Sequence, residues 1–201
     1  MRAWSAYASN QGLAAMRQTQ AQYIAAQAEN ATTTLPGDDP AQRTAALSVA
    51  QPDTSTWAPK RLAEYRSSLG LNMTPGAVLR VPKLGLEVPV YEGTSDAILN
   101  RGAGRIAATA AIDSATGNVG IAAHRDGFFR PLKDIKVGDA LLLDTAAATR
   151  RYRVTRLAVV DPSNVSVLDP TPVATITLVT CYPFYHVGNA PKRFIAIAQL
   201  D

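Results

Sequence analysis

The chain has 201 residues, a net charge of +4, two histidines and one cysteine. A single cysteine excludes an internal disulfide and a multi-cysteine metal site, so Cys181 is a buried small hydrophobe, a surface thiol or a nucleophile. No stretch reaches the roughly 20 predominantly apolar residues of a membrane helix, and no nucleic-acid-binding motif occurs. The sequence therefore predicts neither a membrane span within it nor a nucleic-acid partner.

The first third of the chain differs in composition from the rest. Residues 1–31 are rich in Ala and Gln with apolar residues at partly helical spacing, which predicts a helix. Residues 32–59 contain Thr, Pro and Asp runs typical of a linker. Residues 60–69 suit a short amphipathic helix packed against the domain that follows. We therefore predict an N-terminal helical stem and linker over 1–75 and a separate folded domain over 76–201.

The second part of the chain is a series of short apolar runs separated by turn-rich connections. Eight strands at this spacing predict a mainly β fold, an eight-stranded closed barrel with short helices near 95–99 and 127–134. About 125 residues are enough to bury one core. The predicted strands are 77–82, 86–91, 103–109, 118–123, 139–145, 151–160, 174–180 and 193–199.

Three chemically active side chains stand at the ends of predicted strands. His124 follows the run that begins at Asn118, Cys181 closes the run that begins at Thr175, and Arg193 opens the last strand. If these strands are neighbours, a thiol, an imidazole and a guanidinium meet at one edge of the sheet. The alternatives are an ordinary half-buried histidine at 124 and a solvated strand-edge charge at 193.

Several separated motifs resemble one family in the order in which that family has them. The string Thr-Leu-Val-Thr-Cys over 177–181, with Ala-Pro-Lys-Arg-Phe-Ile over 190–195, resembles the cysteine segment of sortases. The extension Cys-Tyr-Pro-Phe-Tyr, the segment 118–132 with Ala-Ala-His-Arg-Asp-Gly-Phe-Phe, and the early segment 84–93 resemble class D sortases in particular. The resemblance covers about residues 76–200 and implies the sortase β-barrel for that domain.

The resemblance also implies an activity. Cys181 corresponds to the nucleophile, His124 to the catalytic histidine and Arg193 to the arginine of the sortase triad; Ala123 stands where the family usually has Gly. The expected enzyme is a cysteine transpeptidase that cuts a Leu-Pro-x-Thr-Gly or Leu-Pro-x-Thr-Ala sorting signal after Thr and passes the acyl group to an amine. That amine is a cell-wall precursor or a pilin lysine. The resemblance further implies work at the cell surface, with a membrane anchor in the full-length protein that is not visible in this chain.

Other residues are candidates for contact with the substrate. Thr180 matches the threonine before the nucleophile, and Val165, Val167 and Leu168 match apolar positions of the loop that shapes the sortase groove. The alternatives are a packed strand threonine and a short helix packing on the barrel. His186 lies in the loop after the cysteine as a surface residue or a substrate contact. No cofactor and no metal is expected, since the stretch before His124 holds a single carboxylate and calcium needs several oxygen ligands.

Competing functions stay open from sequence. Papain-like enzymes place the cysteine before the histidine and at the start of a helix, which is the reverse of the order here. Enzymes that cross-link peptidoglycan use a cysteine motif that this chain lacks. A non-catalytic peptide-binding β-barrel and a sortase-like protease that mainly hydrolyses its substrate remain as alternatives.

Overall fold

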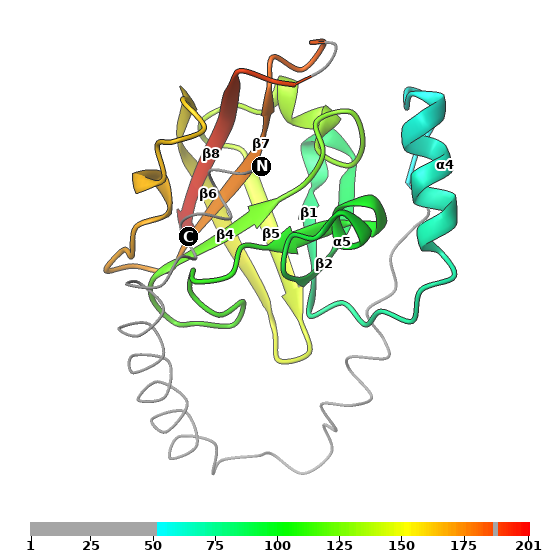
Figure 1. Ribbon diagram of the computed structural model, residues 1–201. Helices are drawn as coiled ribbons and strands as arrows, with labels where there is room; N and C mark the ends of the chain where they lie inside the picture. The colour runs from blue at the N-terminus through cyan, green and yellow to red at the C-terminus, as the bar shows by residue number, and fades with distance from the viewer. Residues whose placement is uncertain (1–51, 187–188) are drawn as a thin grey trace, which may run out of the picture.

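The computed structural model describes residues 52–186 and 189–201. The helix predicted over 1–31 and most of the linker predicted over 32–59 lie outside these residues. Eight strands form a closed barrel in the order β1-β2-β3-β4-β7-β8-β6-β5, which confirms the predicted fold (Figure 1). The strands are β1 (Ala77–Val81), β2 (Leu86–Glu92), β3 (Ala103–Arg105), β4 (Asn118–Ala122), β5 (Ala140–Thr145), β6 (Thr149–Val160), β7 (Thr175–Tyr182) and β8 (Lys192–Leu200).

The helices are short and lie between the strands or before them. They are α4 (Pro59–Ser68), α5 (Asp96–Arg101) and the 3-10 turns η1 (Pro82–Leu84), η2 (Arg130–Asp134) and η3 (Ser166–Leu168). The helix predicted over 127–134 is confined to η2, because Phe128 and Phe129 turn into the barrel core before it. Among the described residues, no helix is long and apolar enough to cross a membrane.

One predicted strand is much shorter in the structure. The run predicted over 103–109 ends at Arg105, and Ala108 has a positive φ of 70°, which an extended strand cannot contain. The guanidinium of Arg105 donates hydrogen bonds to the carbonyls of Thr109 (2.9 Å) and Ala110 (3.2 Å). The chain therefore folds back on itself after Arg105, although its composition resembles a strand.

The barrel strands bury alternate side chains on its inner face. Ile121 of β4, Leu178 of β7 and Ala196 of β8 belong to the main core. The intervening residues Val179 and Ile195 form a second apolar cluster with Leu168 of η3, on the outer face of the same strands. Because side chains alternate along a strand, these two clusters define an inner and an outer face at β4, β7 and β8.

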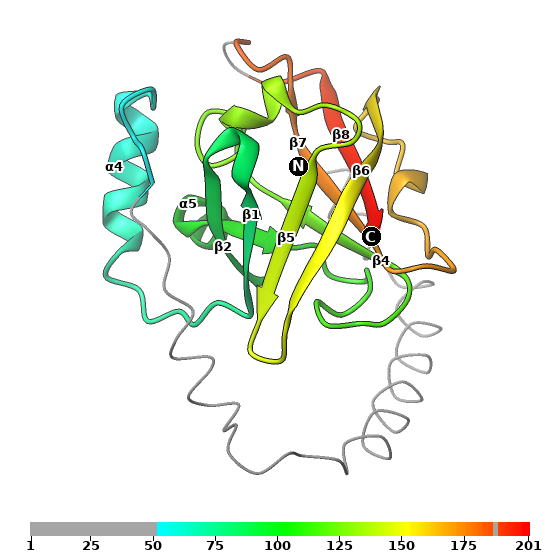
Figure 2. The ribbon, with the colours of Figure 1, turned by 180° about the vertical axis from the view of Figure 1, so that it is seen from behind.

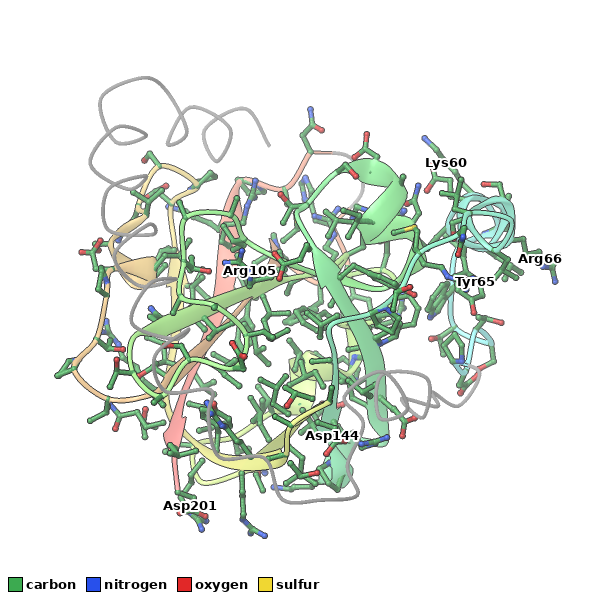
Figure 3. All side chains as sticks on the ribbon, turned by 90° about the horizontal axis from the view of Figure 1, so that it is seen from below. Lys60, Tyr65, Arg66, Arg105, Asp144 and Asp201 are labelled. Carbon is green, nitrogen blue, oxygen red and sulfur yellow. The ribbon has the colours of Figure 1, made fainter. Side chains whose placement is uncertain are left out.

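Helix α4 stands at the side of the barrel and packs against α5 (Figures 1 and 2). The rings of Trp57, Tyr65 and Phe128 pack edge to face with centroids 5.0–5.9 Å apart, and we call these three residues the aromatic cluster. Figure 3 shows Tyr65 on the side of α4 that faces the barrel, whereas Arg66 projects away from it. The short helix predicted to pack on the domain is therefore confirmed, and the domain boundary near residue 76 stays a prediction.

Candidate active site

Cys181 and Arg193 lie on the neighbouring strands β7 and β8, and His124 follows the end of β4, the other neighbour of β7. In the β7–β8 ladder, Cys181 is directly opposite Arg193. Strands β4 and β7 run parallel, and Ala122 at the end of β4 is paired with Val179. Two residues further along both strands, His124 comes level with Cys181. The spacing along three adjacent strands thus brings imidazole, thiol and guanidinium to the same edge.

Hydrogen bonds continue the pairing of β4 with β7 beyond the last regular residue of β4. The Ala123 N–H donates to the Val179 carbonyl at 3.3 Å. The buried hydroxyl of Thr180 donates to the Ala123 carbonyl at 2.7 Å. These two bonds fix the backbone immediately before His124 against the strand that ends in Cys181.

Strand alternation places the three side chains on the same face as well as at the same edge. Cys181 is two residues after Val179, and Arg193 is two residues before Ile195, so both share the outer face with those residues. Ala123 faces the inner core, and His124 therefore returns to the outer face. We call Cys181, His124 and Arg193 the candidate triad.

The position of Ala123 resolves how this chain tolerates its departure from the sortase pattern. Its side chain is 5% exposed and packs in the core inside the barrel. The extra methyl group therefore adds apolar contact on the inner face. It does not project into the outer face that carries the candidate triad.

The cysteine of the candidate triad is not sealed in the core. Cys181 and His124 are both half-buried, and Arg193 is buried with 8% of its surface exposed. Nη1 of Arg193 donates to the carbonyls of Ala190 (3.3 Å) and Lys192 (2.9 Å). The guanidinium is thus held in place by the backbone, opposite a cysteine residue that is only partly buried.

The predicted groove residues have different surroundings. Leu168 is buried against Val179 and Ile195, whereas Val165 and Val167 are half-buried. A Cβ added to Gly120 would lie 2.8 Å from Cδ2 of Leu168, so Leu168 of η3 packs directly on the backbone of β4 at this glycine. Leu168 therefore packs η3 onto the barrel just below the triad. That Val165, Val167 and Leu168 bind peptide stays a prediction.

The loop after Cys181 is tied to the loop after His124. His186 is exposed, and its carbonyl accepts a hydrogen bond of 2.7 Å from Nη2 of Arg125. The guanidinium of Arg130 lies 5.3 Å from the ring centre of Tyr185. Neither contact follows from sequence motifs. They hold the two loops that flank the triad together, and a substrate contact by the His186 side chain stays a prediction.

The protein environment keeps the imidazole of His124 neutral. Burial lowers the pKa of His124 to about 4, and the nearby Arg61 guanidinium acts in the same direction, against the carboxylates of Asp126, Glu64 and Asp96. At neutral pH the imidazole is therefore an unprotonated base next to the thiol.

This shift predicts how stability depends on pH. In the unfolded chain His124 has a pKa near 6.5, so the unfolded state binds more protons than the folded state between pH 6.5 and 4. The contribution of His124 to stability is complete above about pH 6.5 and is lost as the pH falls toward 4. Urea unfolding of wild type, His124→Asn and the exposed-site control His186→Asn at pH 7 and pH 4.5 measures it. We expect His124→Asn to lose less stability than the other two, and equal losses in all three proteins would contradict the shift.

The Thr180 hydroxyl offers a second test of the local structure. Thr180→Val keeps the shape of the side chain but removes the bond to the Ala123 carbonyl, which is expected to cost about 1–3 kcal/mol of stability. Turnover should also fall, because the freed backbone leads directly into His124. Thr180→Ser keeps the hydroxyl and serves as the control. A valine variant with wild-type urea midpoint and turnover would show that this bond is unimportant.

Among residues 52–186 and 189–201, no group of three or more His, Cys, Asp or Glu side chains is placed to hold a metal ion. Asp126, the carboxylate next to His124 in sequence, bonds to Arg61 at 3.2 Å. The carboxylate nearest to His124 in sequence is thus paired with Arg61 of α4. The sequence analysis did not predict this ion pair.

The closed barrel and its edge of thiol, imidazole and guanidinium define the class of cysteine transpeptidases built on a sortase barrel. The sortase domain family model matches residues 79–201, and the chain belongs to the sortase family. It is 32% identical to sortase D of Bacillus subtilis over 142 residues, which are 70% of each protein, and this agrees with the class D motifs. It is 38% identical to sortase SrtE1 of Streptomyces coelicolor over 125 residues, 53% of this chain and 36% of that protein.

Solved structures show the same fold. Sortase E1 of Streptomyces coelicolor, solved with a tripeptide in its active site, matches with a TM-score of 0.57 and 32% identity over 63% of this chain and 88% of that one. A sortase D5 transpeptidase of Clostridium perfringens matches with a TM-score of 0.59 over 80% of this chain and 97% of that one, at 21% identity. The second likeness concerns the fold alone. The family match and the relatives at 32% identity or more make the chain a cell-wall-sorting type of cysteine transpeptidase.

Proposed function

We propose that this enzyme cleaves a Leu-Pro-x-Thr-Gly or Leu-Pro-x-Thr-Ala sorting signal after Thr and transfers the new carboxyl end to a primary amine. The observation that carries the proposal is that Cys181 and Arg193 are paired across β7 and β8 and that His124 follows the end of the adjacent strand β4, with Cys181 only partly buried. In this proposal the domain over 76–201 carries the three catalytic residues, and the residues before it include α4, which packs on the barrel.

In the first half-reaction His124 accepts the proton of the Cys181 thiol, and the thiolate attacks the carbonyl carbon of the substrate Thr. The guanidinium of Arg193 donates hydrogen bonds to the oxygen that becomes negatively charged. The protonated His124 then gives its proton to the departing amide nitrogen as the C–N bond breaks. The product is a thioester between the Thr carbonyl and Cys181.

In the second half-reaction an amine attacks the thioester. His124 accepts a proton from the attacking nitrogen, the C–S bond breaks, and the proton returns to the sulfur as the new amide leaves. A cell-wall precursor and a pilin lysine both offer such an amine. Both acceptors and the sorting signals of surface proteins place the reaction at the outer face of the cell membrane.

The apolar outer face supports binding of an extended peptide beside the triad. Ala122, Val179 and Ile195 form a row one pleat below the triad, and Leu168 of η3 borders it. Val179 and Ile195 are already buried beneath Leu168, so the apolar surface open to the Leu-Pro part of the signal is that of the half-buried Ala122 and Val167 at the edge of this row.

The test uses Leu-Pro-x-Thr-Gly and Leu-Pro-x-Thr-Ala peptides, with and without a lysine-containing peptide, followed by mass spectrometry of the products. We expect cleavage after Thr and a new amide to the lysine side chain. A scrambled peptide with the same composition is the control and should stay intact. The free acid alone, at every amine concentration, would favour the hydrolase, and binding without any turnover would favour the peptide-binding barrel.

A further inference from the structure

Arg61 of α4 makes a network at the edge of the candidate site. Its Nε donates to Asp126 at 3.2 Å, and its Nη1 donates to Glu64 at 2.6 Å and to the side-chain oxygen of Asn100 at 2.5 Å. The Arg61 side chain is only 15% exposed. A guanidinium that reaches α5 and the His124 turn while nearly buried is more than a solvated helix charge.

Arg61 and its hydrogen-bond partners hold the backbone turn that begins at His124. The His124 carbonyl accepts hydrogen bonds from the Gly127 (3.3 Å) and Phe129 (3.2 Å) N–H groups, which makes residues 124–129 a compact turn. A Cβ built on Gly127 would lie 3.6 Å from Cδ of Arg61 and 3.8 Å from Cβ of His124. Phe128 of the same turn is fixed in the aromatic cluster with Trp57 and Tyr65. Helix α4 therefore holds this turn through a charge network and an apolar contact.

We propose that α4 is a working part of the active site and that Arg61 is a positioning residue for His124, acting through Asp126 and through its own charge. The inference rests on the proposed function, in which His124 is the acid and base. The charged groups that act on the imidazole are Arg61 and Glu64 of α4, Asp96 of α5 and Asp126 of its own turn. Arg125 is the next residue in the chain, and Cys181 and Arg193 stand at the same edge of the barrel on β7 and β8.

The two roles of Arg61 have separable consequences. Its positive charge disfavours a second positive charge on the imidazole and so lowers the pKa of His124. Its planar guanidinium group donates hydrogen bonds to two elements at once, to α5 and to the His124 turn. A lysine would keep the positive charge but could not donate to both elements in this geometry, and a glutamine would lose both the charge and the geometry.

The experiment measures the His124 pKa by proton NMR of the imidazole, together with kcat and KM on the sorting-signal peptide. The chain has two histidines, so His186→Asn assigns the signals. For Arg61→Gln we expect the His124 pKa to rise by about one unit, the acidic limb of the rate profile to move with it, and kcat to fall about tenfold at nearly constant KM. Arg61→Lys should keep the pKa near the wild-type value while kcat stays reduced.

The matched control is Lys60→Gln, which removes a charge from the neighbouring position of the same helix. The Lys60 side chain is 89% exposed and approaches Glu64 at 4.0 Å (Figure 3), so its loss should leave both the pKa and kcat unchanged. An Arg61→Gln variant that behaves like Lys60→Gln, or that loses activity only in proportion to unfolded protein, would overturn the inference.

A second variant keeps the test decisive if Arg61→Gln does not fold. Asp126→Asn removes a carboxylate that raises the His124 pKa and loosens the link to α4, so the pKa should fall further and kcat should drop. Unchanged values would overturn the inference. The titration needs no substrate, so its result does not depend on the proposed function. If the His124 pKa moves as expected in the Arg61 and Asp126 variants but the wild-type enzyme cleaves no sorting signal, the proposed function is refuted and the role of α4 stands.

Discussion

Replacing Cys181 with alanine is expected to abolish signal cleavage, with a loss of about ten-thousandfold or more relative to wild type. The sulfur is the atom that forms the covalent intermediate, and alanine offers no nucleophile in its place. The site is half-exposed at the end of β7, so the fold should tolerate the change. Cleavage of a fluorogenic Leu-Pro-x-Thr-Ala peptide by wild type and variant measures the loss.

The control for this prediction separates chemistry from folding. Thermal unfolding of the alanine variant should match wild type, because removing one sulfur at a strand end opens no buried cavity. The variant should also still bind the uncleaved peptide. Cleavage at more than a few per cent of the wild-type rate would remove Cys181 from the proposed mechanism.

Arg193→Lys is expected to lower kcat about 100- to 1000-fold, the range seen when one donor to a developing oxyanion is removed. Among the described residues, Arg193 uses Nη1 for both of its hydrogen bonds, to the Ala190 and Lys192 carbonyls. These bonds leave Nε and Nη2 of the guanidinium as the donors that the proposed mechanism assigns to the substrate oxygen. A lysine keeps the positive charge, but its single ammonium group cannot bond to the backbone carbonyls and at the same time donate a hydrogen bond to the substrate oxygen in a fixed direction.

The neighbouring residue supplies the matched control. Lys192 points to the other face of β8 and pairs with Asp161 at 2.7 Å, so Lys192→Arg should leave kcat unchanged. Steady-state kinetics of the two variants on the same peptide measures the contrast. An Arg193→Lys enzyme with wild-type kcat would reduce Arg193 to a strand-edge cation that is held by the backbone.

The order of the eight strands, though not the length of β3, and the place of the candidate triad at strand ends could be predicted because both are local patterns in the chain. Apolar runs of β-branched and small residues mark β4, β7 and β8, and each active residue stands at the end of such a run. That β4, β7 and β8 are neighbours is a property of the barrel. It could be expected only because the sequence motifs resemble those of a family with this fold. The shared face of Cys181 and Arg193 then follows from the period of two along each strand.

The surroundings of His124 could not be predicted in the same way. Arg61 is 65 residues from Asp126 and lies in a helix whose sequence reads only as amphipathic. No local rule couples these positions, because they meet only after α4 docks on the barrel. The pKa of His124 is equally a product of tertiary burial. Side chains that bridge separate elements are thus the part of the site that requires coordinates.

The most direct measurement is peptide mapping by mass spectrometry of enzyme that is quenched in acid during turnover of a Leu-Pro-x-Thr-Ala peptide. The account predicts a thioester adduct with the mass of the fragment ending in Thr, attached to Cys181 and discharged when amine is added before the quench. Turnover with no adduct, or with the fragment on any other residue, would contradict it.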